Sequence, residues 1–122
     1  MDTVSSFELQ GFQCHWMNSI TKIGYVQIEY DSAKNEFSSM YVLADKIADF
    51  IRNKKELLPV QFDFHYFEPP DQIPTLSVIP RFSGDYEDHN YVYTLSEQKE
   101  KPKTAQNEVV QKLADELLTT IK

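Results

Sequence analysis

The sequence has few of the residues on which several kinds of protein depend. Cys14 is the only cysteine among 122 residues, so no internal disulfide can form. The three glycines, Gly11, Gly24 and Gly84, cannot make up a G-x-G-x-x-G motif or a P-loop. The longest apolar run, residues 40–44, is far shorter than the roughly 20 residues of a membrane-spanning helix. We therefore expect no disulfide framework, no glycine-rich phosphate site and no membrane insertion.

Signals for export are also lacking. Asp2 stands where an export signal would carry a base, and the first lysine is Lys22. No Asn-x-Ser/Thr acceptor for glycosylation occurs in the chain. Together with the single cysteine, these absences predict a protein of the reducing cytoplasm.

Positive charge is scarce and negative charge is concentrated. The chain has 12 basic and 19 acidic residues, a net charge of −7, and its only arginines are Arg52 and Arg81. Residues 56–97 contain eight acidic residues and one base, Arg81, whereas the rest of the chain is balanced. Binding to a phosphate backbone requires clustered Lys and Arg, so direct nucleic-acid binding is not expected. An acidic segment of this kind either keeps the protein soluble or faces a basic partner.

Apolar and polar residues alternate in several short segments, which is typical of half-buried strands. The predicted strands are residues 12–17, 24–30, 60–67, 75–79 and 91–95. Helical spacing of apolar residues predicts helices over residues 43–55 and 104–121.

The segment 32–42 is compatible with two structures. Apolar residues at helical spacing favour one long helix from about Ser32 to Lys55. The turn-forming residues 31–35 and the weak helical pattern that follows them favour a strand at 36–42 before a helix at 43–55. We favour the strand.

These elements predict one α+β domain over residues 1–122, with the order roughly βββαβββα. One-sided helices and half-buried strands bury their apolar faces best when a sheet and a helical layer stack. We therefore expect two layers, an antiparallel sheet of five or six strands with both helices on one of its faces.

Motifs that carry catalysis or metal binding are not found. Cys14 and His15 are adjacent on a predicted strand and so point to opposite faces, which makes Cys14 a core residue rather than a nucleophile. His15, His65 and His89 are scattered without metal-ligand spacing, so neither a metal nor a cofactor is expected. Asp63 and His65 share one strand face and are the pair to test first for catalysis. We do not expect an enzyme.

Aromatic residues gather in the acidic segment, where residues 62–93 hold half of the sixteen aromatics. Phe62, Phe64 and Tyr66 are expected in the core, which leaves Phe67, Tyr86 and Tyr91 to form a contact surface among carboxylates. The predicted partner-binding residues are Phe67, Glu68, Asp71, Asp85, Tyr86, Glu87, Asp88 and Tyr91.

The function favoured by this pattern is a small acidic protein-binding module that inhibits or escorts a basic partner protein. Immunity proteins and nuclease inhibitors work in this manner, and a related form is mimicry of nucleic acid by carboxylates. Two alternatives are an export or assembly chaperone, which would act as a homodimer, and a structural component of a virus or phage. A small enzyme ranks last.

Overall fold

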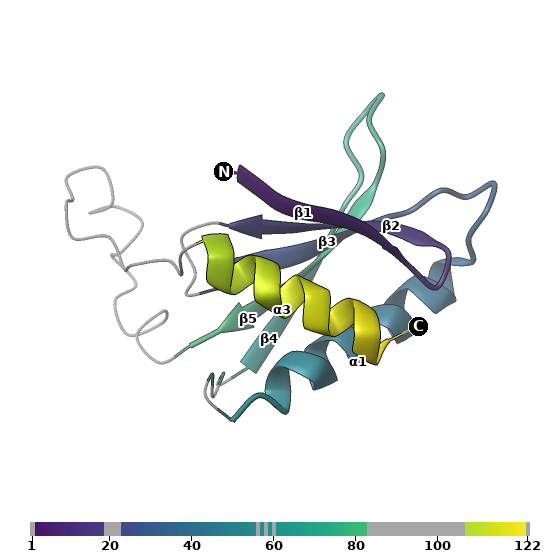
Figure 1. Ribbon diagram of the computed structural model, residues 1–122. Helices are drawn as coiled ribbons and strands as arrows, with labels where there is room; N and C mark the ends of the chain where they lie inside the picture. Colours follow the sequence, from purple (N-terminus) through teal and green to yellow (C-terminus); the bar gives the residue numbers. More distant parts are fainter. Residues whose placement is uncertain are drawn as a thin grey trace.

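The computed structural model describes residues 2–18, 23–55, 57, 59, 61–82 and 107–121. These residues form a five-stranded sheet and two helices (Figure 1). In chain order the elements are β1 (Asp2–Leu9), β2 (Phe12–Asn18), β3 (Tyr25–Glu29), α1 (Phe37–Arg52), β4 (Gln61–Phe67), β5 (Thr75–Arg81) and α3 (Asn107–Thr120).

All strand pairs are antiparallel, and the spatial order is β1-β2-β3-β5-β4. The β1–β2 hairpin turns at Gln10 and Gly11, whose φ values of 51° and 86° are both positive, as a type I′ turn requires. The chain leaves β3 through α1 and returns at the far edge as β4, and β5 then fills the place between β4 and β3.

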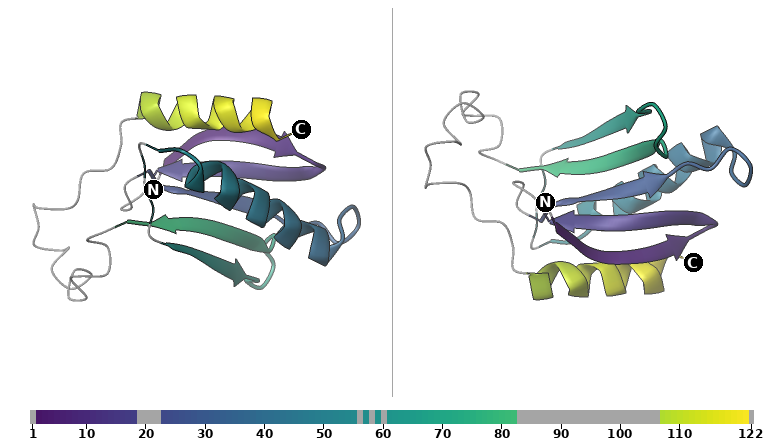
Figure 2. Two further views of the ribbon diagram at one scale, coloured as in Figure 1. Left: turned by 90° about the horizontal axis from the view of Figure 1, so that it is seen from below. Right: turned by 90° about the horizontal axis from the view of Figure 1, so that it is seen from above.

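Both helices lie on the same face of the sheet (Figure 2). α3 lies over β1 and β2, and α1 lies over β3 and β5. Alternate strand residues point into the layer between sheet and helices, as the period of a strand dictates. The described strands contribute nine buried apolar residues to this core, among them the fully buried Trp16, Val26, Ile28, Leu76 and Val78. In the part of the chain that the structure describes, no helix covers the opposite face, which we call the open face.

The β2–β3 connection is held by Trp16 and Gly24. The buried indole Nε1 of Trp16 donates a hydrogen bond of 2.9 Å to the carbonyl oxygen of Ile23. Gly24 follows with a φ of 76°, and a Cβ atom there would lie 1.9 Å from the carbonyl oxygen of Met17. Only glycine fits this position.

The predicted α+β class and the two-layer arrangement are confirmed, but the strand expected at 36–42 is wrong. Those residues form the first turns of α1, which begins at Phe37. Met40 and Leu43 are fully buried and continue the stripe that Ile47 and Ile51 complete. A strand would have placed Met40 and Leu43 on opposite faces, whereas one helix buries both.

The helix also starts later than the alternative prediction of about Ser32. Asp31 accepts hydrogen bonds from the backbone N–H groups of Lys34 and Asn35, and its side chain accepts one from Ala33. Glu36 then has φ −96° and ψ 138°, an extended conformation that separates this turn from α1.

The third strand of the first half is instead β1, which was not predicted. Phe7 and Leu9 alternate with polar residues and are buried, but the preceding Thr-Val-Ser-Ser stretch carries little apolar signal. The segment is a strand because it pairs with β2, although its own pattern of apolar residues is weak. The strand predicted at 91–95 lies outside the described residues. No described helix is both long enough and apolar enough to span a membrane.

Candidate functional site

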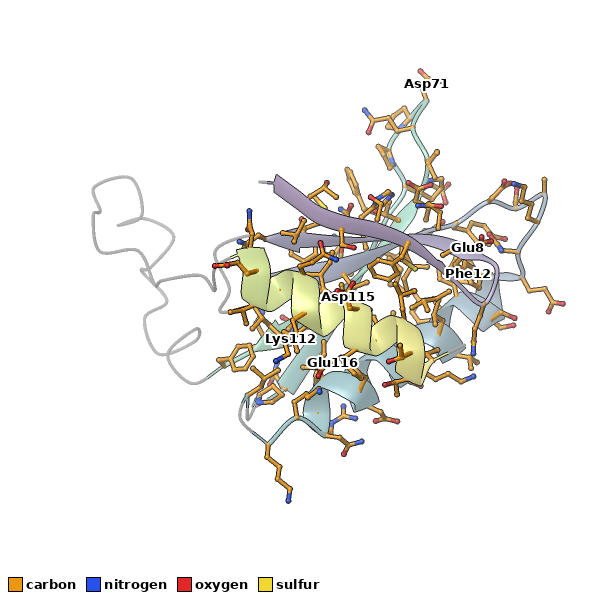
Figure 3. The ribbon with its side chains drawn as sticks, in the orientation of Figure 1. Glu8, Phe12, Asp71, Lys112, Asp115 and Glu116 are labelled. Carbon is orange, nitrogen blue, oxygen red and sulfur yellow. The ribbon has the colours of Figure 1, made fainter. Side chains whose placement is uncertain are left out.

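The described part of the predicted partner-binding surface lies on the β4–β5 hairpin. Phe67 is the last residue of β4, Glu68 follows it, and Asp71 stands at the end of the loop, which projects beyond the sheet (Figure 3). Asp71 has a φ of 58°, a left-handed conformation that an aspartate tolerates in a turn. The remaining predicted residues, Asp85, Tyr86, Glu87, Asp88 and Tyr91, lie outside the described residues.

Two large apolar side chains are exposed beside these acids. Phe67 is 57% exposed and Ile73 is 56% exposed. We call residues 67–73 the hairpin tip. Burial of such side chains against a partner would remove their apolar area from water and so stabilise a complex. The hairpin tip combines the two features that the sequence predicted for a partner-binding surface.

An acidic groove lies between the hairpin and the segment that follows β3. Its volume is about 520 Å³ and it is open to solvent. One wall consists of Glu29, Tyr30, Asp31 and Ser32, and the other of Asp71, Gln72, Ile73 and Pro74. Three lining residues are carboxylates and none of those eight is basic. The groove is therefore suited to a cation.

Backbone hydrogen bonds hold the two walls in place. The N–H of Tyr30 donates to the carbonyl oxygen of Pro74 at 2.9 Å, which ties the end of β3 to the hairpin. On the same wall, the backbone N–H of Asp31 donates to Asn35 Oδ1 at 3.1 Å, and Asn35 Nδ2 donates to the carbonyl oxygen of Gly11 at 3.0 Å. These contacts join the groove to the β1–β2 turn.

An aromatic cluster supports the groove from the helical side. Phe37 packs against Tyr30, Tyr41 and Tyr66 with ring-centroid distances of 5.4, 5.4 and 5.1 Å. The Tyr66 hydroxyl donates a hydrogen bond of 2.8 Å to Glu68 Oε1. Desolvation among the rings, and secondarily this hydrogen bond, raise the pKa of Tyr66 to about 12. Tyr66 therefore remains a hydrogen-bond donor to Glu68 at neutral pH.

The expectation that Phe64 belongs to the core needs correction. Phe64 is 39% exposed, while Phe62 and Tyr66 are partly buried against the core. β4 lies at the end of the strand order, and α1 lies over β5 and β3, so the helical layer covers this strand incompletely. The position of α1, rather than the alternation within β4, decides the exposure of Phe64.

A second polar group lies on the open face. Ser6 of β1 pairs directly with His15 of β2, and the Ser6 Oγ to His15 Nδ1 distance is 2.8 Å. On the other side of the ring, His15 Nε2 lies 2.6 Å from Glu29 Oε2 of β3. Glu29 also lines the acidic groove. The chain Ser6–His15–Glu29 thus crosses three strands and ends at the groove.

The sequence did not predict these hydrogen bonds, because the spacing of residues 6, 15 and 29 matches no motif. The register of β1 with β2, and of β2 with β3, brings the three side chains together. The sequence did indicate which face His15 takes, because alternation along the strand puts it with Gln13 and opposite Cys14. That division is confirmed, since Cys14 is fully buried and His15 is on the open face.

The Asp63 and His65 pair is brought to one face of β4, but Asp63 interacts with other residues. Asp63 Oδ2 accepts a hydrogen bond of 2.9 Å from Arg81 Nε, and Oδ1 accepts one of 3.2 Å from Gln61. Each carboxylate oxygen of Asp63 thus accepts one hydrogen bond, and neither comes from His65. Among the described residues, no group of three or more His, Cys, Asp or Glu side chains could hold a metal ion.

Comparisons of the chain with protein-family models, with curated proteins and with solved structures found no significant match.

Proposed function

We propose that this protein is a small acidic binding module that docks a basic partner protein through its hairpin tip and acidic groove. The observation that carries the proposal is the juxtaposition of exposed Phe67 and Ile73 with the three carboxylates of the groove. It rests also on the net charge of −7, all of which falls in residues 56–97 because the rest of the chain is balanced.

The two parts of this surface contribute differently to binding. Exposed aromatic and aliphatic side chains supply contact area that is removed from water in a complex. Carboxylates at Glu29, Asp31 and Asp71 attract a cationic partner and speed its association at low salt. A lysine or arginine of the partner fits this groove well, because its aliphatic stem can lie on Ile73 and Pro74 while its charge meets the carboxylates.

Binding of this kind serves inhibition or escort. A basic protein that acts on nucleic acid uses its cationic surface for substrate, and an acidic module seated there occludes it. Displacement of this protein by DNA would support the version in which its carboxylates mimic nucleic acid.

The test is capture from an extract of the source cell on three immobilised proteins. These are the wild type, a hairpin variant carrying Phe67→Ser and Ile73→Ser, and a control carrying Val42→Ser and Val109→Ser. Val42 and Val109 are 54% and 49% exposed but lie on α1 and α3, so the control removes comparable apolar surface elsewhere.

We expect the wild type and the control to retain one basic protein in stoichiometric amount, released by moderate salt, and the hairpin variant to lose it. Equal retention by the hairpin variant and the wild type would show that the hairpin tip is not the contact surface. Retention of many unfolded proteins, with dimerisation, would instead support the chaperone alternative.

A further inference from the structure

The Ser6–His15–Glu29 chain has an order of donors and acceptors that its chemistry imposes. A carboxylate can only accept hydrogen bonds, so the contact of 2.6 Å to Glu29 places a proton on His15 Nε2. In a neutral imidazole the other nitrogen is then an acceptor, and the Ser6 hydroxyl must donate to Nδ1 across 2.8 Å. A serine hydroxyl bonded to the unprotonated nitrogen of a histidine, whose second nitrogen a carboxylate holds, is the arrangement of an activated nucleophile.

A substrate can reach the three side chains Ser6, His15 and Glu29. Ser6 is exposed, and the His15 and Glu29 side chains are 23% and 28% exposed. Nucleophile, base and orienting carboxylate stand on three adjacent strands of a rigid sheet, which fixes their geometry better than loops would. These residues lie on the face that no described helix covers (Figure 2).

An acyl transfer also needs a donor for the oxygen that becomes negative. The backbone N–H groups of β1 and β2 lie in the plane of the sheet and do not point toward the open face, so a side chain must serve. Gln13 is exposed on the same face, two residues before His15, and pairs with Glu8, which puts it diagonally across from Ser6. Its carboxamide makes no hydrogen bond within the described part of the chain and is the nearest amide donor by register.

From this arrangement we propose a second activity: Ser6 is a nucleophile that His15 activates, and the open face hydrolyses small activated esters. Ser6 Oγ bonds to the ester carbonyl carbon as its proton passes to His15 Nδ1. The bond from that carbon to the leaving oxygen then breaks, and the imidazolium returns the proton to the leaving alkoxide or phenoxide. Water then bonds to the acyl carbon as its proton passes to Nδ1, the bond from that carbon to Ser6 Oγ breaks, and the imidazolium returns the proton to Oγ, which releases the carboxylic acid and restores the starting state.

The test uses a biotin-tagged fluorophosphonate on the full chain, with the modified residue located by mass spectrometry. The hydroxyl oxygen of an activated serine bonds to phosphorus, fluoride leaves, and the proton is taken up by His15 and passes to solvent. We expect labelling at Ser6 and not at Ser77, a serine on the same face that pairs with Gln27 and with His65 but whose hydroxyl makes no hydrogen bond to that ring among the described residues. We also expect hydrolysis of p-nitrophenyl acetate that Ser6→Ala abolishes and Ser77→Ala leaves unchanged.

The remaining residues are tested by the rate of labelling. His15→Gln should slow it by about 100-fold, since a general base contributes roughly 10² to 10⁴ in rate. Glu29→Gln should slow it by at least about 10-fold, because a carboxamide can donate to Nε2 and so turn the protonated nitrogen toward Ser6. Gln13→Leu should lower the ester hydrolysis rate and leave thermal unfolding unchanged.

Imidazole added to His15→Ala should restore labelling, a result that a purely structural role of His15 would not give. Absence of a Ser6 adduct, while a serine hydrolase in the same tube is labelled, would overturn the proposal. Equal labelling of Ser6 and Ser77, or an undiminished rate in folded His15→Gln, would overturn it as well. The variant Phe67→Ser with Ile73→Ser should keep full labelling, so failure of the binding proposal and failure of this one are distinguishable.

Discussion

His15 Nε2 lies 2.6 Å from Glu29 Oε2, although His15 pairs in the sheet with Gln27 and not with Glu29. This diagonal contact connects the open face to the acidic groove, because Glu29 lines one wall of that groove. Glu29 therefore both accepts a hydrogen bond from His15 and contributes its negative charge to the groove. The two candidate functions therefore share one residue while they depend on different surfaces.

The first prediction concerns the two glycines at positive φ. Gly24→Ala should lower the free energy of unfolding by at least roughly 3 kcal/mol, because the left-handed backbone strain adds to a forced contact with the Met17 carbonyl oxygen. Gly11→Ala is the matched control. Its φ is also positive, but nothing lies within 4 Å of the added methyl group, so about 1 to 2 kcal/mol is expected. Urea unfolding of both variants measures the difference, and equal losses would contradict it.

The second prediction concerns Cys14. Burial is the main cause that raises the pKa of its thiol from 9.0 to about 12. The folded protein should therefore react with a disulfide reagent at pH 8 far more slowly than the same protein in denaturant. Because the folded state holds this proton more tightly, Cys14 should make stability fall as the pH rises between 9 and 12. Rapid reaction under native conditions would show that Cys14 is accessible.

A third prediction follows from the contact between α3 and the segment that follows α1. Lys54 Nζ donates a hydrogen bond of 2.7 Å to Glu116 Oε1, and this bond is the main cause that lowers the pKa of Glu116. Lys54→Met should raise that pKa toward its ordinary value, whereas Lys55→Met, at the exposed neighbour, should leave it unchanged. Carboxyl titration by NMR reports the value directly. The stability that this pair contributes is present at neutral pH and declines as the pH falls through the pKa of Glu116 in the folded protein.

The fourth prediction concerns association with the proposed basic partner. Asp71→Lys should slow binding several-fold at low salt, because it reverses a charge at the groove. Asp45→Lys makes the same change in net charge at an exposed site on α1 and serves as the control. Stopped-flow association rates at two salt concentrations measure both effects. An equal loss in the two variants would indicate that net charge alone attracts the partner.

Much of the architecture was predictable because burial leaves a local pattern. The alternation at residues 12–17 and 24–30 corresponds to β2 and β3, and the apolar stripe ending at Ile121 corresponds to α3. The exposure of Phe67 was predicted for the same reason, since its neighbours Tyr66 and Phe64 take the other face of β4. These features depend on residues within a few positions of one another.

Other features depended on contacts that no local pattern encodes. The segment 36–42 suits either a strand or a helix by itself, and the packing of Met40 and Leu43 against the sheet decides for the helix. β1 is ordered by its pairing with β2, and the groove exists because the Tyr30 to Pro74 bond joins two segments more than forty residues apart.

The amino-acid sequence by itself thus determined the α+β class, the burial of Cys14 and the acidity of the segment that holds the hairpin tip. Only the tertiary structure decided that Ser6, His15 and Glu29 meet on one face and that Glu29 and Asp71 line one groove. The physical reason is that periodicity specifies which face a side chain takes, whereas strand register and helix placement specify its neighbours.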